Sequence, residues 1–488
     1  MSYCAYITTL KNLRKHSNAD RLQVGECLGN SVVVSLEYTE GQRGIYFPVD
    51  GKLSKEFAEI NNLVRKKDAE GKNIGGYLDP DKRNITAIKL RSEKSDGLFL
   101  PLKCLETFGD ISTLNDGDRI DTFNGHLICE KYIPRRNHST HTTGNYKKKY
   151  KNTINIAPTF AEHVDTEQLN YNLDAFKPGD DIEITLKLHG SSHRVGYLPV
   201  LKGYNDSWHC RLRNWFWFNF NRITHKNDLN STLDSFKHDG KPIYKYDYIA
   251  GTRRVILENY EGGYYGDNHF REPHSKFFEG KLWKGETVYM EIVGFTDTGT
   301  PIMPPCANSK LNDKDFVKKY GETTVFSYGC EANPKPTTME FDNLDISHLT
   351  WERPQSDIYV YRMTLTTEEG YVVEYGPDYM RYRCEQMGVK TVPVFEKFYI
   401  PNKEELNALD VSAGEYVKEI VNKYLNTEPD PIGKTHIKEG VVVRIINRPK
   451  FTAYKDKVFE FKVIEGLIKS AASCPDIEEA EEILDKDN

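Results

Sequence analysis

The stretch that decides the fold is "EITLKLHGSSHRVG", residues 183–196. Apolar and polar residues alternate up to Leu186, which is typical of a half-buried strand. Lys187 ends this strand, and His189, Gly190 and two serines follow at once. Small residues allow a ligand to approach the backbone closely. The stretch therefore predicts a strand that presents an amine to a ligand.

The overall composition indicates a globular protein inside a cell. With 488 residues, the chain has room for two or three domains, and its mean hydropathy of −0.63 is low. No apolar run reaches bilayer length, and the first residues lack the order of a secretory signal, so we expect an intracellular protein with no membrane contact. A phage or viral source stays open. Nine cysteines without a CxxC pair predict reduced, mostly buried thiols rather than zinc or disulfides.

Charge is distributed unevenly along the chain. The net charge of −6 argues against a uniformly basic nucleic-acid-binding surface. Residues 131–155 are rich in Lys, Arg, Asn and Thr, and we interpret them as a basic linker. Within it, Lys147, Lys148 and Lys149 are candidate RNA contacts, although a solvated hinge explains them too. Residues 471–488 form an acidic tail.

Residues 1–130 are interpreted as a small β domain. Short strands are expected near 21–28, 31–37, 44–49, 85–90 and 97–102, with turns at Gly29-Asn30, Glu40-Gly41 and Ser95-Asp96-Gly97. This spacing predicts a closed OB-like barrel. Another small β domain fits the pattern equally well.

Residues 156–470 are expected to form a mixed α+β domain with a mainly antiparallel sheet. Its expected strands are rich in β-branched and aromatic residues and cover 181–188, 288–295, 357–365, 439–447 and 457–465. A helical segment is expected near 402–425.

Four charged residues interrupt these apolar strands: Lys187, Glu291, Glu439 and Lys462. An unpaired buried charge is costly, so each must face solvent or a partner. The solvent face of an alternating strand explains any one of them. Together they suit a polyanionic ligand with its metal.

The ordered set "KLHG", "MEIVG", "YVYRM", "EGVVVR" and "FKVI" resembles motifs I, III, IIIa, IV and V of the covalent nucleotidyltransferase superfamily, which includes polynucleotide ligases and mRNA capping enzymes. Within it, the chain looks most like ATP-dependent RNA ligases with an N-terminal OB domain. The resemblance covers most of residues 1–470, with 198–248 and 297–357 as expansions.

The resemblance implies that Lys187 is the nucleophile that attacks ATP and carries AMP as a phosphoramidate. His189 takes the place of the motif I aspartate, as in several RNA ligases, although a strand-end structural histidine is the alternative. Gly190 and Ser192 would then contact the nucleotide, and Glu291 the ribose hydroxyls.

The resemblance also places Arg253 and Lys462 on the phosphates, with Arg254 as a rival to the arginine. It implies that Tyr361 stacks on adenine, although it shares a strand face with Tyr359 and core packing is equally compatible. The amine attacks only when unprotonated, and a divalent cation disfavours the ammonium.

We therefore expect Mg²⁺ or Mn²⁺, with its waters held by Glu439 and Glu291.

Two departures from the superfamily pattern matter. Motif V commonly reads Lys-x-Lys, but its first position here is Glu460, and Lys457 is a possible substitute. No long segment follows motif V, whereas DNA ligases and capping enzymes carry an OB domain there.

The leading hypothesis is an ATP-dependent RNA ligase that joins 5′-phosphate and 3′-hydroxyl ends, including nicks in duplex RNA, and acts as a monomer. Further RNA contacts are expected from the barrel and from "CRLRNWFWFNFNR", residues 210–222, although core packing is favoured for that aromatic run. The alternatives are a capping-type guanylyltransferase and a non-catalytic RNA-binding protein.

Overall fold

The computed structural model describes residues 3–67, 73–133, 156–224, 238–257, 260, 268–334 and 354–470. Most of the predicted basic linker, with Lys147, Lys148 and Lys149, lies outside these residues, as does the predicted acidic tail.

The N-terminal domain consists of short antiparallel strands around an apolar core. One sheet has the order β11 (Leu98–Pro101), β5 (Arg43–Phe47), β1 (Ala5–Thr9) and β12 (Arg119–Ile120), and another contains β2 (Lys11–Lys15), β3 (Leu22–Cys27) and β4 (Asn30–Ser35). Smaller pairs join β9 (Ala87–Leu90) to β10 (Glu93–Asp96) and β6 (Gly51–Leu53) to β15 (Cys129–Lys131). The expected strands are confirmed, but the pairings within residues 3–67 and 73–133 form separate sheets and no closed ring.

Two predicted turns in this domain are partly wrong. Asn30 belongs to β4, so the turn before it consists of Leu28 and Gly29. Ser95 and Asp96 belong to β10, and only Gly97 bends the chain before β11. Its φ of 116° favours glycine, and a Cβ there would lie 2.6 Å from the carbonyl oxygen of Phe47.

The second domain contains two large sheets and the small antiparallel pair of β22 (Cys306–Ala307) and β23 (Thr323–Thr324). The large sheets are antiparallel except where β16 pairs with β29 and β24 with β26. The five-stranded sheet has the order β16 (Glu167–Gln168), β29 (Thr452–Lys457), β28 (Gly440–Ile445), β17 (Asp181–Lys187) and β27 (Val394–Tyr399). The seven-stranded sheet has the order β20 (Ile256–Leu257), β19 (Pro242–Gly251), β18 (Ser191–Tyr204), β21 (Glu286–Gly294), β24 (Ser356–Thr366) and β25 (Val372–Glu374), with β26 (Lys390–Thr391) beside β24. The expected mixed α and β fold with mainly antiparallel strands is confirmed.

The segment expected to be helical near 402–425 forms two helices, α7 (Lys403–Leu409) and α8 (Ala413–Asn422). Asp410 adopts a left-handed conformation that ends α7, and Ser412 caps the start of α8. Both helices pack on the apolar face of the five-stranded sheet. The opposite face of this sheet is not part of that apolar core.

The expectation of a strand over 457–465 is wrong. Strand β29 ends at Lys457, and helix α9 (Phe459–Ser470) follows. Phe461 and Ile464 are fully buried at helical spacing, which explains the apolar run. Lys462 therefore lies on a helix.

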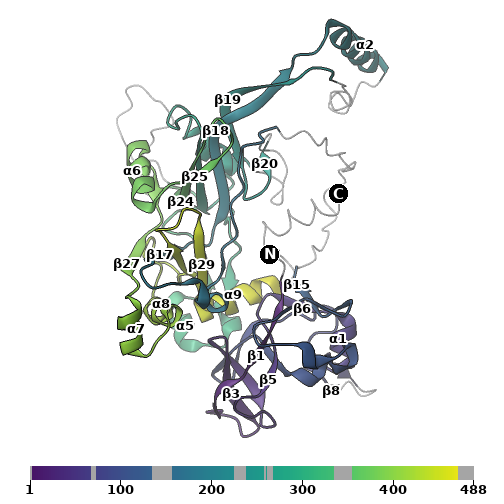
Figure 1. Ribbon diagram of the computed structural model, residues 1–488, viewed down its shortest axis with the longest axis vertical. Coiled ribbons are helices and arrows are strands. Elements are labelled where there is room, and N and C mark those ends of the chain that lie inside the picture. Colours follow the sequence, from purple (N-terminus) through teal and green to yellow (C-terminus); the bar gives the residue numbers. More distant parts are fainter. Residues whose placement is uncertain are drawn as a thin grey trace.

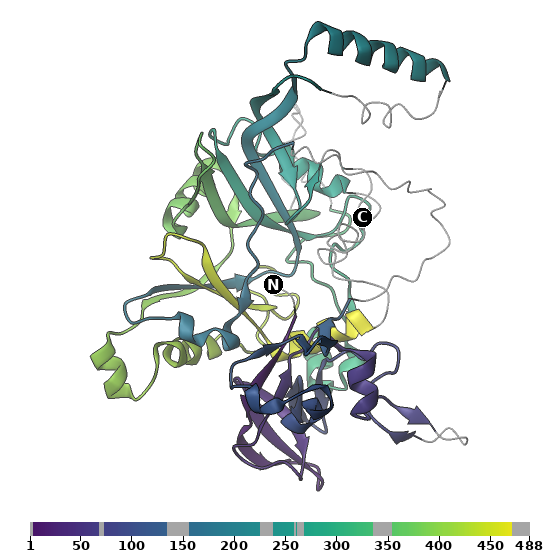
Figure 2. The ribbon, with the colours of Figure 1, turned by 45° about the vertical axis from the view of Figure 1, so that its right-hand side comes forward.

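Helix α9 lies between the two domains, as Figures 1 and 2 show. The Lys462 ammonium is 2.5 Å from the Asp96 carboxylate, and Lys94 is 3.1 Å from Glu460. These ion pairs join α9 to the N-terminal domain. The ion pair with Lys94 also explains why position 460, where motif V commonly has a lysine, holds a glutamate.

The aromatic run in 210–222 lies on helix α2 (Trp208–Thr224), which stands at the far end of the hairpin made by β18 and β19 (Figures 1 and 2). The favoured core packing is wrong for the aromatic residues of this run whose side chains the structure describes. Trp215 and Phe216 are 58% and 59% exposed.

Further helices in the described residues are α1 (Lys55–Ile60), α4 (Glu272–Lys276), α5 (Lys314–Tyr320) and α6 (Pro377–Met387). None of the helices in the described ranges has the length and apolar character needed to cross a membrane. The cysteines in those ranges are free thiols, and all except Cys4 are buried, as expected.

Candidate functional site

A cavity of about 290 Å³ lies where the two sheets meet the N-terminal domain. This is close to the lower size limit of small-molecule sites. Its lining includes most of the residues predicted to bind nucleotide: Lys187, His189, Gly190, Arg253, Glu291, Glu439 and Lys462. Residues from segments more than 250 positions apart in sequence thus meet at one site.

Strand register explains how the lysines reach the cavity. Lys187 pairs with Gly440 on β28, and Gly440 pairs with Lys457 on β29. Directly opposite residues point to the same face of a sheet, and residues two apart share that face. Lys187, Lys455 and Lys457 therefore project together from the face opposite the apolar core.

Glu439 is the centre of the charge arrangement. Its carboxylate is 1% exposed, and Oε1 lies 2.9 Å from Lys187 Nζ and 3.1 Å from Lys457 Nζ. Burial raises the pKa of this carboxyl, but the two ammonium groups outweigh burial and hold the pKa below its usual value. Glu439 is therefore ionised at neutral pH.

The second carboxylate oxygen of Glu439 is available to a cation. Oε2 is buried and has no hydrogen-bond partner among the described residues, and His189 Nδ1 is 3.9 Å away. A hard divalent cation or its water would satisfy this oxygen. Glu291 lines the same cavity from β21.

His189 is held by aromatic rings and by its backbone. Its ring meets Phe326 and Phe461 edge-on, at centroid distances of 4.7 and 4.9 Å. Burial lowers the pKa of His189, so the ring is neutral at neutral pH. Its backbone N–H donates to the Tyr328 hydroxyl at 2.6 Å. Tyr328 was not predicted, because it lies in a segment interpreted only as an expansion.

Gly190 fits the site because a side chain would not. A Cβ at Gly190 would lie 2.6 Å from the carbonyl oxygen of Ile292 and 3.3 Å from Glu291 Oε2. The chain crosses from one sheet to the other here, between β17 and β18. Glycine therefore allows the loop after Lys187 to pass close to β21.

Two cationic residues complete the cavity. Burial and then the neighbouring ammonium groups of Lys457 and Lys187 lower the pKa of Lys455 to about 8. Arg253 lines the cavity and donates to Asp165 at 3.0 Å. Its rival Arg254 also contacts Asp165, but it does not line the cavity. Together with Lys187 and Lys457, these groups suit phosphate.

Three predicted residues are placed differently. Ser192 and Tyr361 lie outside the cavity lining and contact each other, with 3.4 Å between their hydroxyl oxygens. Lys462 lines the cavity, but its ammonium contacts Asp96. Lys457, the predicted substitute for the missing cation, and Lys455, which was not predicted, both line the cavity from β29. Their signal was the alternation in "YKDK", residues 454–457.

Comparisons with known proteins find similarity in structure alone. No family model matches the chain, and no curated protein sequence is significantly similar to it. Three solved structures of mutant Naegleria gruberi RNA ligase match it along nearly the whole chain, each with a TM-score of 0.50. The unliganded form is 16% identical and covers 94% of this chain and 97% of the ligase.

A second of these structures, with AMP and Mn, is 15% identical over 94% of this chain and 97% of the ligase. The third, with ATP and Mn, is 15% identical over 95% of this chain and 99% of the ligase. The chain has the fold of these RNA ligase structures. The likeness confirms the expected mixed α and β fold with mainly antiparallel sheets, and the described part of the N-terminal domain has no closed barrel.

Proposed function

We propose that the protein is an ATP-dependent RNA ligase that joins a 5′-phosphate to a 3′-hydroxyl through a covalent lysyl-AMP intermediate. The observation that carries this proposal is the contact of Lys187 with the buried Glu439, beside Lys455 and Lys457 in one cavity. A lysine that only faced solvent at the end of a strand would not contact a buried carboxylate beside two further lysines.

In the first step, the Lys187 amine gives up a proton and attacks the α-phosphorus of ATP. A P–N bond forms, and the bond from the α-phosphorus to the bridging oxygen breaks, so that pyrophosphate leaves with the electron pair. Lys455, Lys457 and Arg253 are placed to bind the phosphate oxygens on which negative charge develops. Neutral His189 orients the loop that carries the nucleophile.

In the second step, an oxygen of the RNA 5′-phosphate attacks the phosphorus of lysyl-AMP and displaces the lysine nitrogen. In the third, the RNA 3′-hydroxyl loses its proton, attacks the RNA phosphorus and expels AMP. The product is a phosphodiester. Over one cycle, ATP becomes AMP and pyrophosphate, and Lys187 is regenerated.

The residues fit a divalent cation, either Mg²⁺ or Mn²⁺. Glu439, with its buried and unpartnered Oε2, and Glu291 would hold the ion through its waters. When bound, the ion supplies Lewis-acid polarisation of the phosphoryl oxygens. The matched ligase structures with ATP or AMP and Mn support this assignment.

The substrate assignment rests on the likeness to solved structures. The matched proteins are RNA ligases, which supports RNA as the substrate, and we extend this to nicked duplexes and a monomeric enzyme. We also propose an OB-type relationship for the N-terminal domain, because it places short antiparallel strands beside the cavity. Lys147, Lys148 and Lys149 are proposed RNA contacts.

The test incubates the purified protein with radiolabelled ATP or GTP and a divalent cation, then denatures it. The proposal predicts retention of the label from ATP and sealing of nicked RNA. Retention from GTP alone would favour the guanylyltransferase alternative. A protein that retains neither label and still binds RNA would be a non-catalytic binder.

A further inference from the structure

The β18–β19 hairpin and helix α2 form an arm that extends from the candidate site. The arm comprises residues 191–224 and 238–251. Strand β18 begins at Ser191, directly after the nucleophile's loop, and has 14 residues, so it spans about 45 Å at ~3.3 Å per residue. Figures 1 and 2 show α2 at the far end of the arm, away from both domains.

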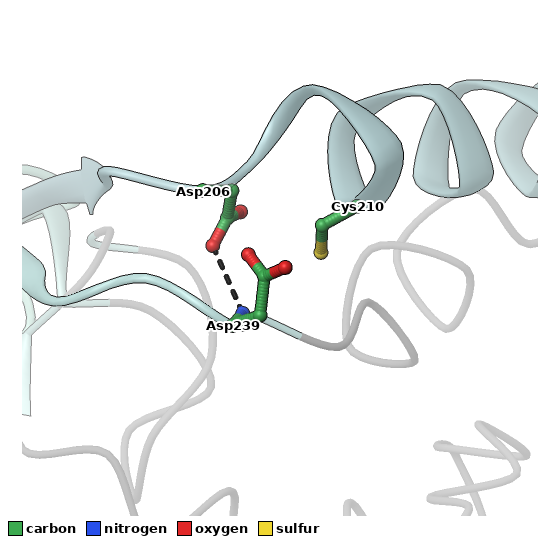
Figure 3. A group of neighbouring side chains, drawn as sticks. All are labelled: Asp206, Cys210 and Asp239. Carbon is green, nitrogen blue, oxygen red and sulfur yellow. Dashed lines mark hydrogen bonds between the residues drawn. The ribbon is translucent and has the colours of Figure 1, made fainter.

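The tip of the arm is anchored, so α2 has a defined direction. Asp206 accepts hydrogen bonds from the backbone N–H groups of Asp239 and Gly240, at 3.1 and 3.0 Å. Asp239 in turn accepts from the backbone and hydroxyl of Ser207 at 2.9 and 2.6 Å. Figure 3 shows Asp206 and Asp239 beside the buried Cys210. These hydrogen bonds join the two chain segments at the start of α2, which explains why the Asp206 and Asp239 carboxylates lie close together.

The surface of α2 combines exposed aromatic rings with positive charge. Trp208, Trp215 and Phe216 are 65%, 58% and 59% exposed. The helix contains three arginines, at 211, 213 and 222, and no acidic residue. Exposed aromatic rings at this density mark an interaction surface. The charge is complementary to a polyanion.

The arrangement around the helix favours nucleic acid over a membrane surface. At about 100° per residue, Trp217 lies on the opposite side of the helix from Trp208, and Arg213 lies between Phe216 and Trp217. A helix lying in a membrane surface separates its apolar face from its charged face. Aromatic rings interleaved with arginines instead suit bases that stack and phosphates beside them.

Tyrosines form a further aromatic surface along the β18–β19 hairpin of the arm. Tyr197 stacks on Tyr248 at 4.6 Å and contacts Tyr246 at 5.8 Å. Tyr244, Tyr246 and Tyr248 alternate along β19, so they share one face of the hairpin. Tyr244 is 38% exposed, and the Lys284 ammonium lies over the Tyr246 ring at 5.2 Å. An aromatic and cationic track thus leads towards α2.

We propose that the arm binds an unpaired segment of the same RNA whose ends are joined, at a fixed distance from the junction. This rests on the proposed function, which places the RNA ends at the base of the arm. Unpaired bases are required because rings cannot stack on bases within a duplex. An arm of about 45 Å reaches roughly 16 base pairs from the junction, at ~2.8 Å per pair of an A-form RNA duplex.

The test compares nicked RNA duplexes of about 10 base pairs on each side, with and without an unpaired tail of about 20 nucleotides on either end. The wild type should join one of the two tailed RNAs with a KM about tenfold lower than that of the untailed RNA. Trp215→Ala with Phe216→Ala should abolish this advantage and leave kcat and lysyl-AMP formation unchanged. Arg211→Glu should reduce it with the aromatic rings intact.

The matched control is Tyr371→Ala with Tyr382→Ala, which removes rings that are 72% and 54% exposed but lie outside the arm. It should keep the advantage of the tail. Absence of that advantage in the wild type, or its survival in the α2 variants, would overturn the proposal. So would binding of the arm to vesicles containing phosphatidylserine without any effect of the tail.

Tryptophan fluorescence with the tail RNA alone separates this proposal from the proposed function. In one outcome, the RNA quenches the fluorescence of the wild type but not of the α2 variants, while the protein forms no lysyl-AMP. This result would support the RNA-binding arm and reject the ligase. Normal ligation with no quenching would retain the ligase and reject the arm.

Discussion

Lys455 gives the site a dependence on pH that binding measurements can detect. Burial and its cationic neighbours lower its pKa to about 8, so the ammonium exists below that pH and is lost above it. We place this ammonium on the phosphates of ATP. Affinity for ATP should therefore be constant near pH 7.5 and decline as the pH rises past about 8.

The magnitude follows from the titration. At pH 8 about half of the molecules carry the proton and at pH 9 about one in ten, so Kd should rise about fivefold between pH 8 and pH 9. The assay is equilibrium binding of α,β-methylene ATP, whose α–β bridge cannot be cleaved, so the chemistry of Lys187 does not contribute. The decline should level off above the pKa that Lys455 acquires when phosphate is bound.

Two variants sharpen this prediction. Lys455→Arg keeps its charge throughout, so its Kd should not change with pH over this range. Lys455→Met should bind about 10- to 100-fold more weakly at pH 7.5 and lose the pH dependence, because a charge-assisted contact is absent at every pH. A wild-type Kd that is unchanged from pH 7.5 to 9.5 would refute the assignment of Lys455 to the phosphates.

The remaining predictions concern the loop and the metal. Tyr328→Phe removes the acceptor of the buried His189 N–H at a cost of about 1–3 kcal/mol, so lysyl-AMP formation should slow about 10- to 100-fold in rapid-quench measurements. Gly190→Ala places a Cβ 2.6 Å from the Ile292 oxygen and should weaken ATP binding in calorimetry. Chelation by EDTA should stop lysyl-AMP formation and Mn²⁺ should restore it, and Glu439→Gln should raise the Mn²⁺ needed for half-maximal rate about 10- to 100-fold.

Each of these variants has a control with a similar change outside the site. Tyr320→Phe removes a hydroxyl that contacts only the Thr427 carbonyl in the described residues, and it should react at the wild-type rate. Gly376→Ala meets no atom within 4 Å and should bind ATP normally. Glu428→Gln, at a carboxylate with 74% exposure, should leave the Mn²⁺ requirement unchanged. Equal effects in a variant and its control would remove the role assigned to that residue.

The sequence predicts some strands of each domain because their patterns are local, but it misses others, such as β18 and β19. Alternation up to Leu186 identifies β17 and places Lys187 at its end, and the charged Glu291 and Glu439 stand out within apolar runs. Pairing between distant strands then brings these residues together. That convergence depends on register, which no single strand encodes.

The failures have physical causes. The run around Phe461 is apolar enough for a strand, but its buried residues recur at helical spacing, and a short apolar run leaves this choice open. Lys462 therefore reaches the cavity from a helix, whereas Lys455 and Lys457 reach it from β29. The aromatic run of α2 is expected in a core by composition, and only the position of the helix at the end of the arm explains why Trp215 and Phe216 are exposed.

The measurement that tests the central claim most directly is tandem mass spectrometry of the protein after incubation with ATP and Mg²⁺. The account predicts a mass increase of one AMP, located on the peptide at Lys187 and absent from Lys187→Ala. The same variant should still seal RNA that already carries AMP at its 5′ end. An AMP group on another residue, or an unmodified Lys187 in a protein that seals RNA, would contradict the account.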